Sequence, residues 1–243
     1  MASSNQMAEH QLTTGIRNRV RVAIDLHGVL FPAILVHRLW VVTYRRLFGA
    51  KTFVMGGNEY PYFHHPCTFN SDRTVEISLG RSFLEEAKPG TRILEIGNVL
   101  SNFFPFTHDV LDKYEKANRP GYFQEDIVDF KPDGSYDRII SISTLEHVGI
   151  DEDKYEPEKV LVALRRMKDF LAPGGIMMFT APLGYSRCLD DSIRSNRAEC
   201  QRYFFLKRIS KDNRWREHDG SGPWLHGSPY PHGNTLFVGY YTK

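Results

Sequence analysis

The sequence predicts an α/β fold: a Rossmann-like, doubly wound, mostly parallel sheet with an antiparallel C-terminal edge strand and an N-terminal helical extension. Short apolar runs alternate with polar segments from Thr91 onward. A helical stretch over 157–171 leads directly into another apolar run, GIMMFTAP. Pro173, Gly174 and Gly175 end that helix and turn the chain into the strand, as a helix-to-strand crossover requires.

The individual elements follow from the spacing of the apolar residues. We expect five strands in the runs RILEIG, HDVLD, GYFQEDI, YDRIISIS and GIMMFTAP. The helix rests on apolar residues that recur at i, i+3 and i+4, namely Val160, Leu164, Met167, Phe170 and Leu171. QRYFFLKRIS and TLFVGYY predict two more strands, joined by a long polar loop over 211–234. A loop of that length in a compact domain is usually functional or disordered.

The length and composition indicate one main domain. The chain has 243 residues, of which 41% are hydrophobic, enough for a single α/β core. The turn signal Lys88-Pro89-Gly90 separates an N-terminal third from the alternating remainder. We expect a flexible tail over 1–12, a helical cover region over 13–88 and the main α/β domain over 89–243.

Charge and cysteine content limit the classes of partner and compartment. Lys and Arg number 31 against 29 Asp and Glu, so the net charge of +2 does not indicate a nucleic-acid partner. The three cysteines lack paired spacing and the N-terminus lacks a secretory pattern, which favours a cytoplasmic protein. The apolar stretch 29–42 is too short to span a bilayer; the aromatic and basic side chains of segment 29–48 suit a buried helix or a peripheral membrane contact.

Polar residues stand at the ends of the first three predicted strands, where ligands bind in doubly wound sheets. Glu95 offers a carboxylate to a cationic group, and Gly97 lets the backbone approach a ligand. Asp112 follows the second strand and can accept hydrogen bonds from a ribose diol. Asp126 and Ile127 follow the third and offer an acceptor and an apolar wall to a base. Acids at such positions also cap helices.

Taken in order, these runs resemble the class I S-adenosylmethionine (SAM)-dependent methyltransferase family. ILEIG is similar to the first motif, VLD to the ribose acid, FQEDI to the adenine acid, and YDRIISISTLEHV to the post-II motif. LRRMKDFLAPGGIMMFTAP is similar to the helix and strand that come next in the family. The resemblance covers roughly 91–185, is nearest to small-molecule O-methyltransferases that contain LEHV, and implies an enzyme with SAM as its cofactor.

The resemblance also implies cofactor contacts. Glu95 and Gly97 would lie near the methionine moiety, Asp112 at the ribose, Asp126 and Ile127 at the adenine, and Ser143 to Leu145 beneath the cofactor near the transferring methyl. The family's usual GxGxG turn is absent, because Gly97 is followed by Asn98-Val99-Leu100. Asn98 tolerates unusual φ and substitutes for one glycine. Glu115 is an alternative ribose acid.

Methyl transfer needs positioning, plus a base when the acceptor is a hydroxyl or a protonated amine. His147 follows the fourth strand, and histidine titrates near neutral pH, so we predict it as the catalytic base; orienting a loop is the alternative. Glu146 and His147 also resemble half of the metal site of ubiquinone-pathway O-methyltransferases and small-RNA methyltransferases. The glutamate that completes that site is replaced by Ser143, so no metal is expected.

Two polar segments are candidates for the acceptor site. WLHGSPYPHGN supplies His226, Tyr230 and His232, which we predict to bind the acceptor; a solvated loop is the alternative. The segment with Arg73 and Glu76 is placed to close over cofactor and substrate. The sequence thus predicts SAM-dependent methyl transfer to a small-molecule or glycan acceptor at a hydroxyl, or alternatively an inactive binding or scaffold protein with a methyltransferase fold.

Overall fold

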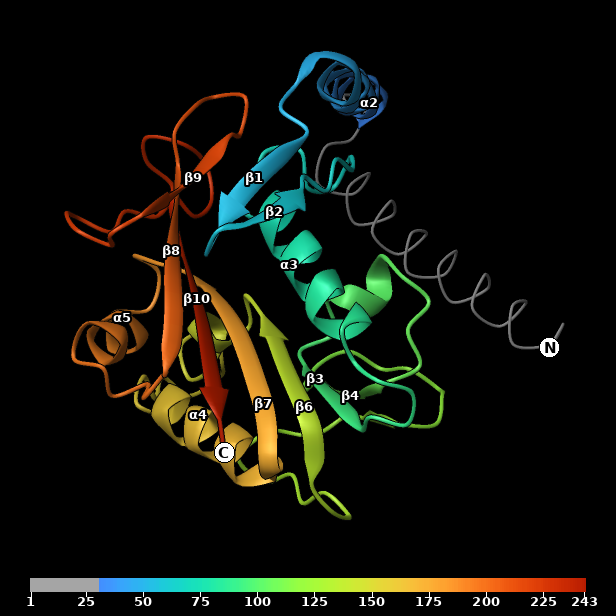
Figure 1. Cartoon of the computed structure of the whole chain (residues 1–243), viewed down its shortest axis with the longest axis vertical. Coiled ribbons are helices and arrows are strands. Elements are labelled where there is room, and N and C mark those ends of the chain that lie inside the picture. Colours follow the sequence, from blue (N-terminus) through green and yellow to red (C-terminus); the bar gives the residue numbers. More distant parts are fainter. Residues whose placement is uncertain (1–30) are drawn as a thin grey trace, which may run out of the picture.

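The computed structural model describes residues 31–243, and Figure 1 shows their arrangement. The tail predicted over 1–12 lies outside the described residues. The same holds for the parts of the predicted cover region and membrane segment that precede residue 31.

Eight strands form one sheet in the order β5-β4-β3-β6-β7-β10-β8-β9. Neighbouring strands from β5 to β7 are parallel, and β10 pairs antiparallel with both β7 and β8. The parallel part has the 3-2-1-4-5 order of a doubly wound fold, which confirms the predicted fold class. The strands are β3 (Ile93–Ile96), β4 (Asp109–Leu111), β5 (Tyr122–Phe123), β6 (Tyr136–Ile142), β7 (Leu171–Pro182), β8 (Arg202–Arg208), β9 (Trp215–His218) and β10 (Thr235–Thr242).

The C-terminal strand β10 is antiparallel, as predicted, but lies inside the sheet, with β8 and β9 beyond it. Leu236, Phe237 and Val238 of β10 are all buried, which is typical of a strand covered on both faces. The edge is formed instead by β9, a short strand with the sequence WREH inside the segment predicted as a loop. A four-residue run with one large apolar side chain gives too weak a periodicity to predict a strand.

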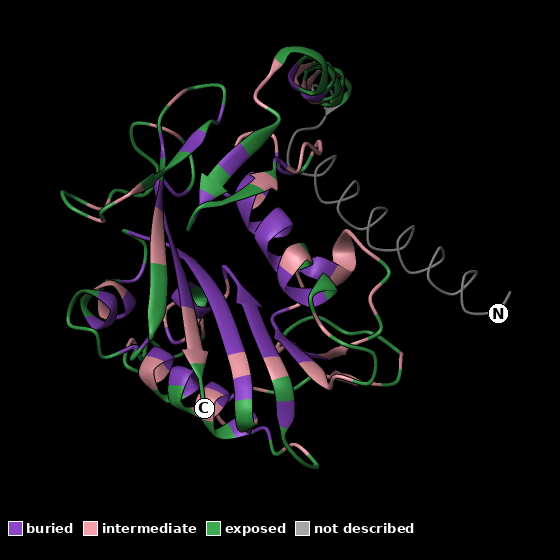
Figure 2. Ribbon diagram, viewed as in Figure 1, coloured by how far each residue is buried: buried purple, intermediate pink, exposed green. Residues whose placement is uncertain are grey.

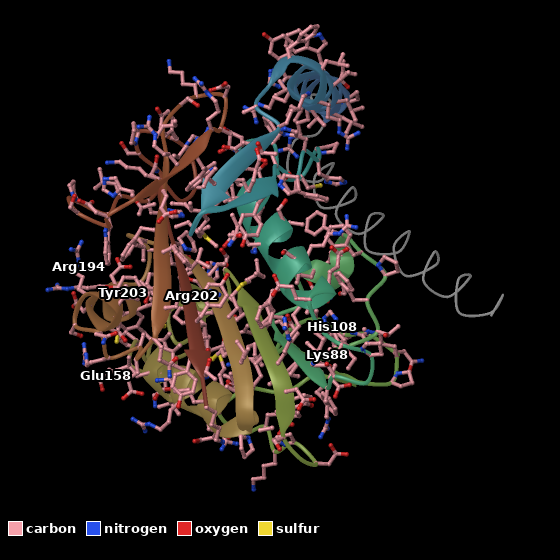
Figure 3. The ribbon with its side chains drawn as sticks, viewed as in Figure 1. Lys88, His108, Glu158, Arg194, Arg202 and Tyr203 are labelled. Atoms are coloured by element: carbon pink, nitrogen blue, oxygen red, sulfur yellow. The ribbon has the colours of Figure 1, made fainter. Side chains whose placement is uncertain are left out.

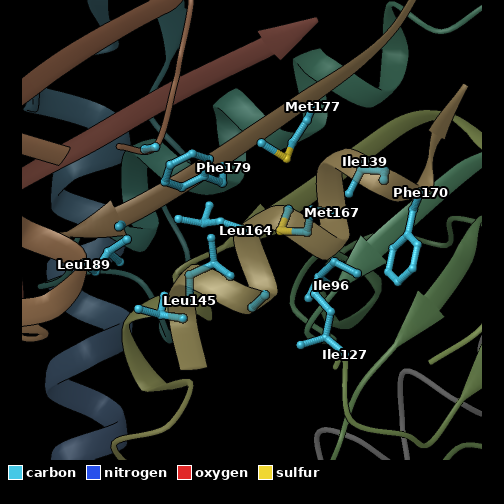
Figure 4. Packing of buried hydrophobic residues seen from close by; sticks show 14 of the residues in the cluster. Ile96, Ile127, Ile139, Leu145, Leu164, Met167, Phe170, Met177, Phe179 and Leu189 are labelled. Carbon is cyan, nitrogen blue, oxygen red and sulfur yellow. The ribbon is translucent and has the colours of Figure 1, made fainter. Parts of the chain in front are cut away.

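Helices cover both faces of the sheet. On one face α3 (Arg73–Glu85) contributes Val75, Ile77 and Leu79 to a cluster that also holds Ile140 of β6. On the other face α4 (Lys159–Phe170) and α5 (Arg187–Arg194) pack into a second cluster, which includes Ile139 of the same strand. Adjacent strand residues point to opposite faces, so the two apolar layers lie back to back. Figure 2 shows this buried interior, and Figure 4 shows the second cluster from nearby.

The N-terminal extension contains a helix, as predicted, and also a β-hairpin that was not. Helix α2 (Phe31–Phe48) is followed by β1 (Thr52–Met55) and β2 (Asn58–Pro61), which pair across Gly56 and Gly57, both with positive φ. The Gly56 amide donates to Glu217 Oε2 on β9 at 2.7 Å, joining the hairpin to the sheet edge. None of the described helices is long and apolar enough to cross a membrane.

Candidate functional site

The candidate site lies where the carboxyl ends of β3, β6 and β7 meet the first turn of α3. Ser143, directly after β6, has φ +39, a region that non-glycine residues rarely occupy and that clusters at functional sites. Its hydroxyl donates to Glu76 Oε1 on α3, and so does Thr180 Oγ1 on β7, at 2.6 Å. Three elements distant in sequence are thereby tied together at one point.

Gly97 allows β3 and β6 to end close together. Its φ is +82, and a Cβ added there would lie 2.2 Å from Thr144 Oγ1. Only glycine fits both the conformation and the space. The predicted requirement for glycine at this turn therefore has a local cause in the packing against Thr144.

Glu95 is fully buried under the turn that follows β3. One carboxylate oxygen accepts the backbone N–H groups of Val99 at 2.9 Å and Leu100 at 2.6 Å, and the other lies 2.7 Å from His108 Nε2. Figure 3 labels His108 near β4. This side chain organises the turn and its 3₁₀ segment (Leu100–Asn102), the place where the sequence lacks a GxGxG turn. The predicted contact of Glu95 with a methionine moiety remains a prediction.

Asp112, the predicted ribose acid, follows β4 and also braces the turn. It accepts from the backbone N–H groups of Asn98 (2.9 Å), Tyr114 (2.9 Å) and Glu115 (2.7 Å). The Asn98 side chain in turn donates to Glu115 Oε2 at 2.7 Å. A carboxylate has about four lone-pair positions, so Asp112 retains acceptor capacity, and Glu115 lies beside it.

Asp126, the predicted adenine acid, sits in a network of ion pairs. Lys113 and Lys159 both contact its carboxylate and both also pair with Glu152. Burial acts to raise the pKa of Asp126, but hydrogen bonds from Lys159 and Lys113 outweigh it, and the pKa lies below its ordinary value. Ile127 is buried in the same core cluster as Leu145, as Figure 4 shows, and so belongs to the apolar core next to this site.

The site also contains a group of buried carboxyls, which the sequence did not predict to lie together. Glu76 and Glu146 are 0% and 1% exposed, and Asp72 is buried beside them. Burial raises the pKa of Glu76 to about 7 against the opposing charge of Arg73. Burial, reinforced by the negative charge of Glu76, raises the pKa of Glu146 well above its usual range. The signal available in the sequence was the pairing of Glu146 with His147; nothing there places Glu76 next to Ser143.

His147, the predicted base, lies at the rim of this group. Its side chain is 47% exposed; Nε2 is 3.5 Å from Glu146 Oε1, and Nδ1 contacts Asp151. Tyr185 donates to the same Asp151 at 2.7 Å and packs edge-on against both His147 and His226. The structure therefore brings predicted residues His147 and His226 together through an aromatic side chain, Tyr185, that was not predicted.

The other predicted acceptor residues lie in the loop before β10. Tyr230 lies under the buried guanidinium of Arg208, whose carbon is 4.6 Å from the ring centroid. Partial burial lowers the pKa of His232, and the positive charges of Arg208 and Arg73 lower it further. The Gly233 amide donates to Asp72 Oδ2 at 3.2 Å, which docks the loop on the start of α3. Among residues 31–243, no group of three His, Cys, Asp or Glu side chains is arranged to hold a metal ion.

No protein-family model and no curated protein sequence matches the chain. Among solved structures the chain is similar to the N-methyltransferase NodS from Bradyrhizobium japonicum, with S-adenosylhomocysteine bound, at 15% identity, TM-score 0.46, over 71% of this chain and 87% of that one. It is also similar to the sugar N-methyltransferase KedS8 from Streptoalloteichus, at 18% identity and TM-score 0.31, over 44% of this chain and 48% of that one. A third similar structure is the glycopeptide N-methyltransferase MtfA complexed with SAM, at 9% identity and TM-score 0.39, over 69% of this chain and 94% of that one.

Proposed function

We propose that this protein is a SAM-dependent methyltransferase that acts on a small-molecule or glycan acceptor. The observation that carries the proposal is the alignment of acids near the carboxyl ends of parallel strands. Glu95 is the second-last residue of β3, Asp112 directly follows β4, and Asp126 lies three residues after β5, with β5, β4 and β3 adjacent in the sheet. Ligands of doubly wound sheets bind at this edge. The order of the acids matches the order of the methionine, ribose and adenine contacts that the resemblance implies.

The residues present fit an adenosine moiety. Asp112 retains about one free acceptor position and Glu115 lies beside it, so the two carboxylates together suit a ribose diol. Asp126 is held as a carboxylate, which suits an exocyclic amine, and Ile127 adds an apolar surface. Bound there, the cofactor would supply a methyl group on a positively charged sulfur. The chain itself would orient donor and acceptor and accept a proton.

The proton acceptor we propose at the surface of the site is His147, because its ring is exposed, oriented by Asp151, and 3.5 Å from the carboxylate of Glu146. His226, Tyr230 and His232 lie on the loop that docks against α3, and we propose that this loop contacts the acceptor. The sequence favours a hydroxyl as the methylated group. The buried carboxyls of Glu76 and Glu146 favour an amine instead, because a bound cation would stabilise the ionised form that their burial disfavours.

A test of the cofactor site is Asp126→Ala. Loss of the acceptor for the adenine amine is expected to weaken binding of S-adenosylhomocysteine by about 1 to 3 kcal/mol. Asp129→Ala is the matched control, because Asp129 is an exposed acid three residues away. Calorimetric titration of both variants measures the difference. Equal affinities for the two variants would remove Asp126 from the cofactor site.

We also propose a peripheral membrane contact through α2. Its apolar and aromatic side chains are strongly exposed, which is uncommon on a soluble surface that has no partner; they are Val36, Trp40, Tyr44, Leu47 and Phe48. The positively charged Arg46 is exposed on the same helix. Aromatic and basic residues together suit the boundary between headgroups and acyl chains of an anionic membrane.

A further inference from the structure

Two carboxyl oxygens in the candidate site are buried without a hydrogen-bond donor. Glu76 Oε2 and Glu146 Oε2 each lack such a partner within the described part of the chain, although both side chains are almost completely inaccessible to solvent. Leaving a buried acceptor unpaired costs free energy, and native proteins rarely do so without a functional reason. The two groups are close enough for the charge of Glu76 to act on Glu146.

Around the two glutamates, the carboxyls outnumber the positively charged groups that act on them. The carboxyls of Asp72, Glu76 and Glu146 interact with one another, and the cation that acts on all three is Arg73. Arg73 Nη1 is 3.5 Å from Glu76 Oε2, yet the same guanidinium is shared with backbone oxygens, at 3.0 Å for Ile142 and 3.4 Å for Ser143. A positively charged ligand would correct the imbalance and supply the missing donors.

The position of the two glutamates points to the acceptor rather than to the donor. The proposed adenosine contacts stand after β4 and β5, whereas Glu76 lies in the first turn of α3 and Glu146 in the 3₁₀ turn after β6. The loop proposed to bind the acceptor docks on Asp72, four residues before Glu76. Because the described residues hold no metal-ligating group of three, an organic cation suits the pair better than a metal ion.

We propose that Glu76 and Glu146 bind the protonated amino group of the methyl acceptor, so that the acceptor is an amine. This inference rests on the proposed methyl transfer. The ammonium donates to the two unpaired oxygens. It then gives one proton to a carboxylate, the freed nitrogen lone pair forms the new N–C bond to the methyl carbon, and the electron pair of the broken C–S bond stays on sulfur. His147, next to Glu146 and open to solvent, passes the proton outward.

The experiment measures binding of a small cation directly. The full chain is labelled at its glutamate carboxyl carbons and titrated with ethylammonium, and in parallel with ethanol, in the presence of S-adenosylhomocysteine. We expect ethylammonium, and not ethanol, to shift the Glu76 and Glu146 resonances in a saturable manner. Glu146→Gln keeps the shape but removes the negative charge, and is expected to weaken ethylammonium binding about tenfold. Glu125→Gln, at an exposed acid, is expected to leave it unchanged.

The outcomes separate this inference from the proposed function. If S-adenosylhomocysteine binds but ethylammonium causes no saturable shift, the amine site is wrong and methyl transfer stands. Should ethylammonium bind while neither SAM nor S-adenosylhomocysteine does, the cation site is supported and the donor is not. A Glu146→Gln variant that weakens SAM far more than S-adenosylhomocysteine would overturn the assignment to the acceptor, because the cation would then be the sulfonium. Displacement of ethylammonium by equimolar manganese would likewise overturn it in favour of a metal.

Discussion

At the scale of single residues, the site is defined by how burial sets the charge of carboxyls. Asp126 is held ionised by two lysines, whereas Glu76 and Glu146 resist ionisation because few donors compensate for their burial. The candidate site thus contains carboxyls with opposite tendencies to ionise. Perturbed titrating groups of this kind cluster at functional sites.

The raised pKa of Glu76 predicts a specific dependence of stability on pH. Below the ordinary pKa of a glutamate, near 4.5, Glu76 is protonated in both the folded and the unfolded chain and has no effect. Between that value and about 7 the unfolded chain ionises first, so the free energy of unfolding falls as pH rises. Above about pH 7 the contribution of Glu76 to the free energy of unfolding no longer changes with pH. Asp72, Arg73 and Glu146 are the charged groups that face Glu76.

Glu76→Gln removes this titration. From about pH 5 to about pH 8 the free energy of unfolding falls in the unmodified protein. We expect it to fall by roughly 1 to 3 kcal/mol less in the variant. Urea unfolding at the two pH values measures the difference, with Glu125→Gln as the exposed control. Parallel pH profiles for Glu76→Gln and the unmodified protein would show that Glu76 titrates normally in the fold.

At the scale of elements, the turn after β3 replaces the expected glycine-rich loop by a single glycine and two bracing carboxylates. Gly97 supplies the positive φ and the close approach to Thr144, while Glu95 and Asp112 supply acceptors for the turn's N–H groups. The helix after this strand is accordingly reduced to the 3₁₀ segment Leu100–Asn102. A rigid turn is therefore available without the usual motif.

Gly97→Ala and Gly174→Ala separate two causes of destabilisation. Both glycines have positive φ, +82 and +77, but only at Gly97 does an added Cβ meet another atom. Both variants are expected to lose stability from backbone strain, and Gly97→Ala to lose about 1 to 3 kcal/mol more from the clash with Thr144. Chemical denaturation measures both. Equal losses would mean that Thr144 moves aside without cost.

Helix α2 gives a prediction about membranes. The double variant Trp40→Ser with Tyr44→Ser is expected to reduce flotation of the protein with anionic liposomes at least severalfold, because it removes two of the exposed aromatic side chains. Tyr155→Ser removes a tyrosine that is 70% exposed in the segment before α4 and is the matched control. Absence of flotation for all of these proteins, including the unmodified one, would reject the membrane contact.

At the scale of the whole molecule, the parallel sheet was predictable because its buried strands are continuous apolar runs with clear turns between them. The interior place of β10 was not, since pairing order depends on contacts between segments distant in sequence. The hairpin β1–β2 has only two four-residue strands, too short for a reliable period. The strand-end acids were recognisable from their order, whereas the meeting of Glu76 with Ser143 and Thr180 depends on how α3 packs across the sheet.

The proposed function depends on one property of the molecule, a site for adenosine at the ends of β3, β4 and β5. Calorimetric titration of the full chain with S-adenosylhomocysteine and with SAM tests it most directly. We predict saturable binding with a micromolar dissociation constant, exothermic because it is formed largely by hydrogen bonds to Asp112 and Asp126. No heat of binding at millimolar concentrations of either ligand, with a small amine acceptor probe also present, would contradict methyl transfer and favour an inactive binding protein with this fold.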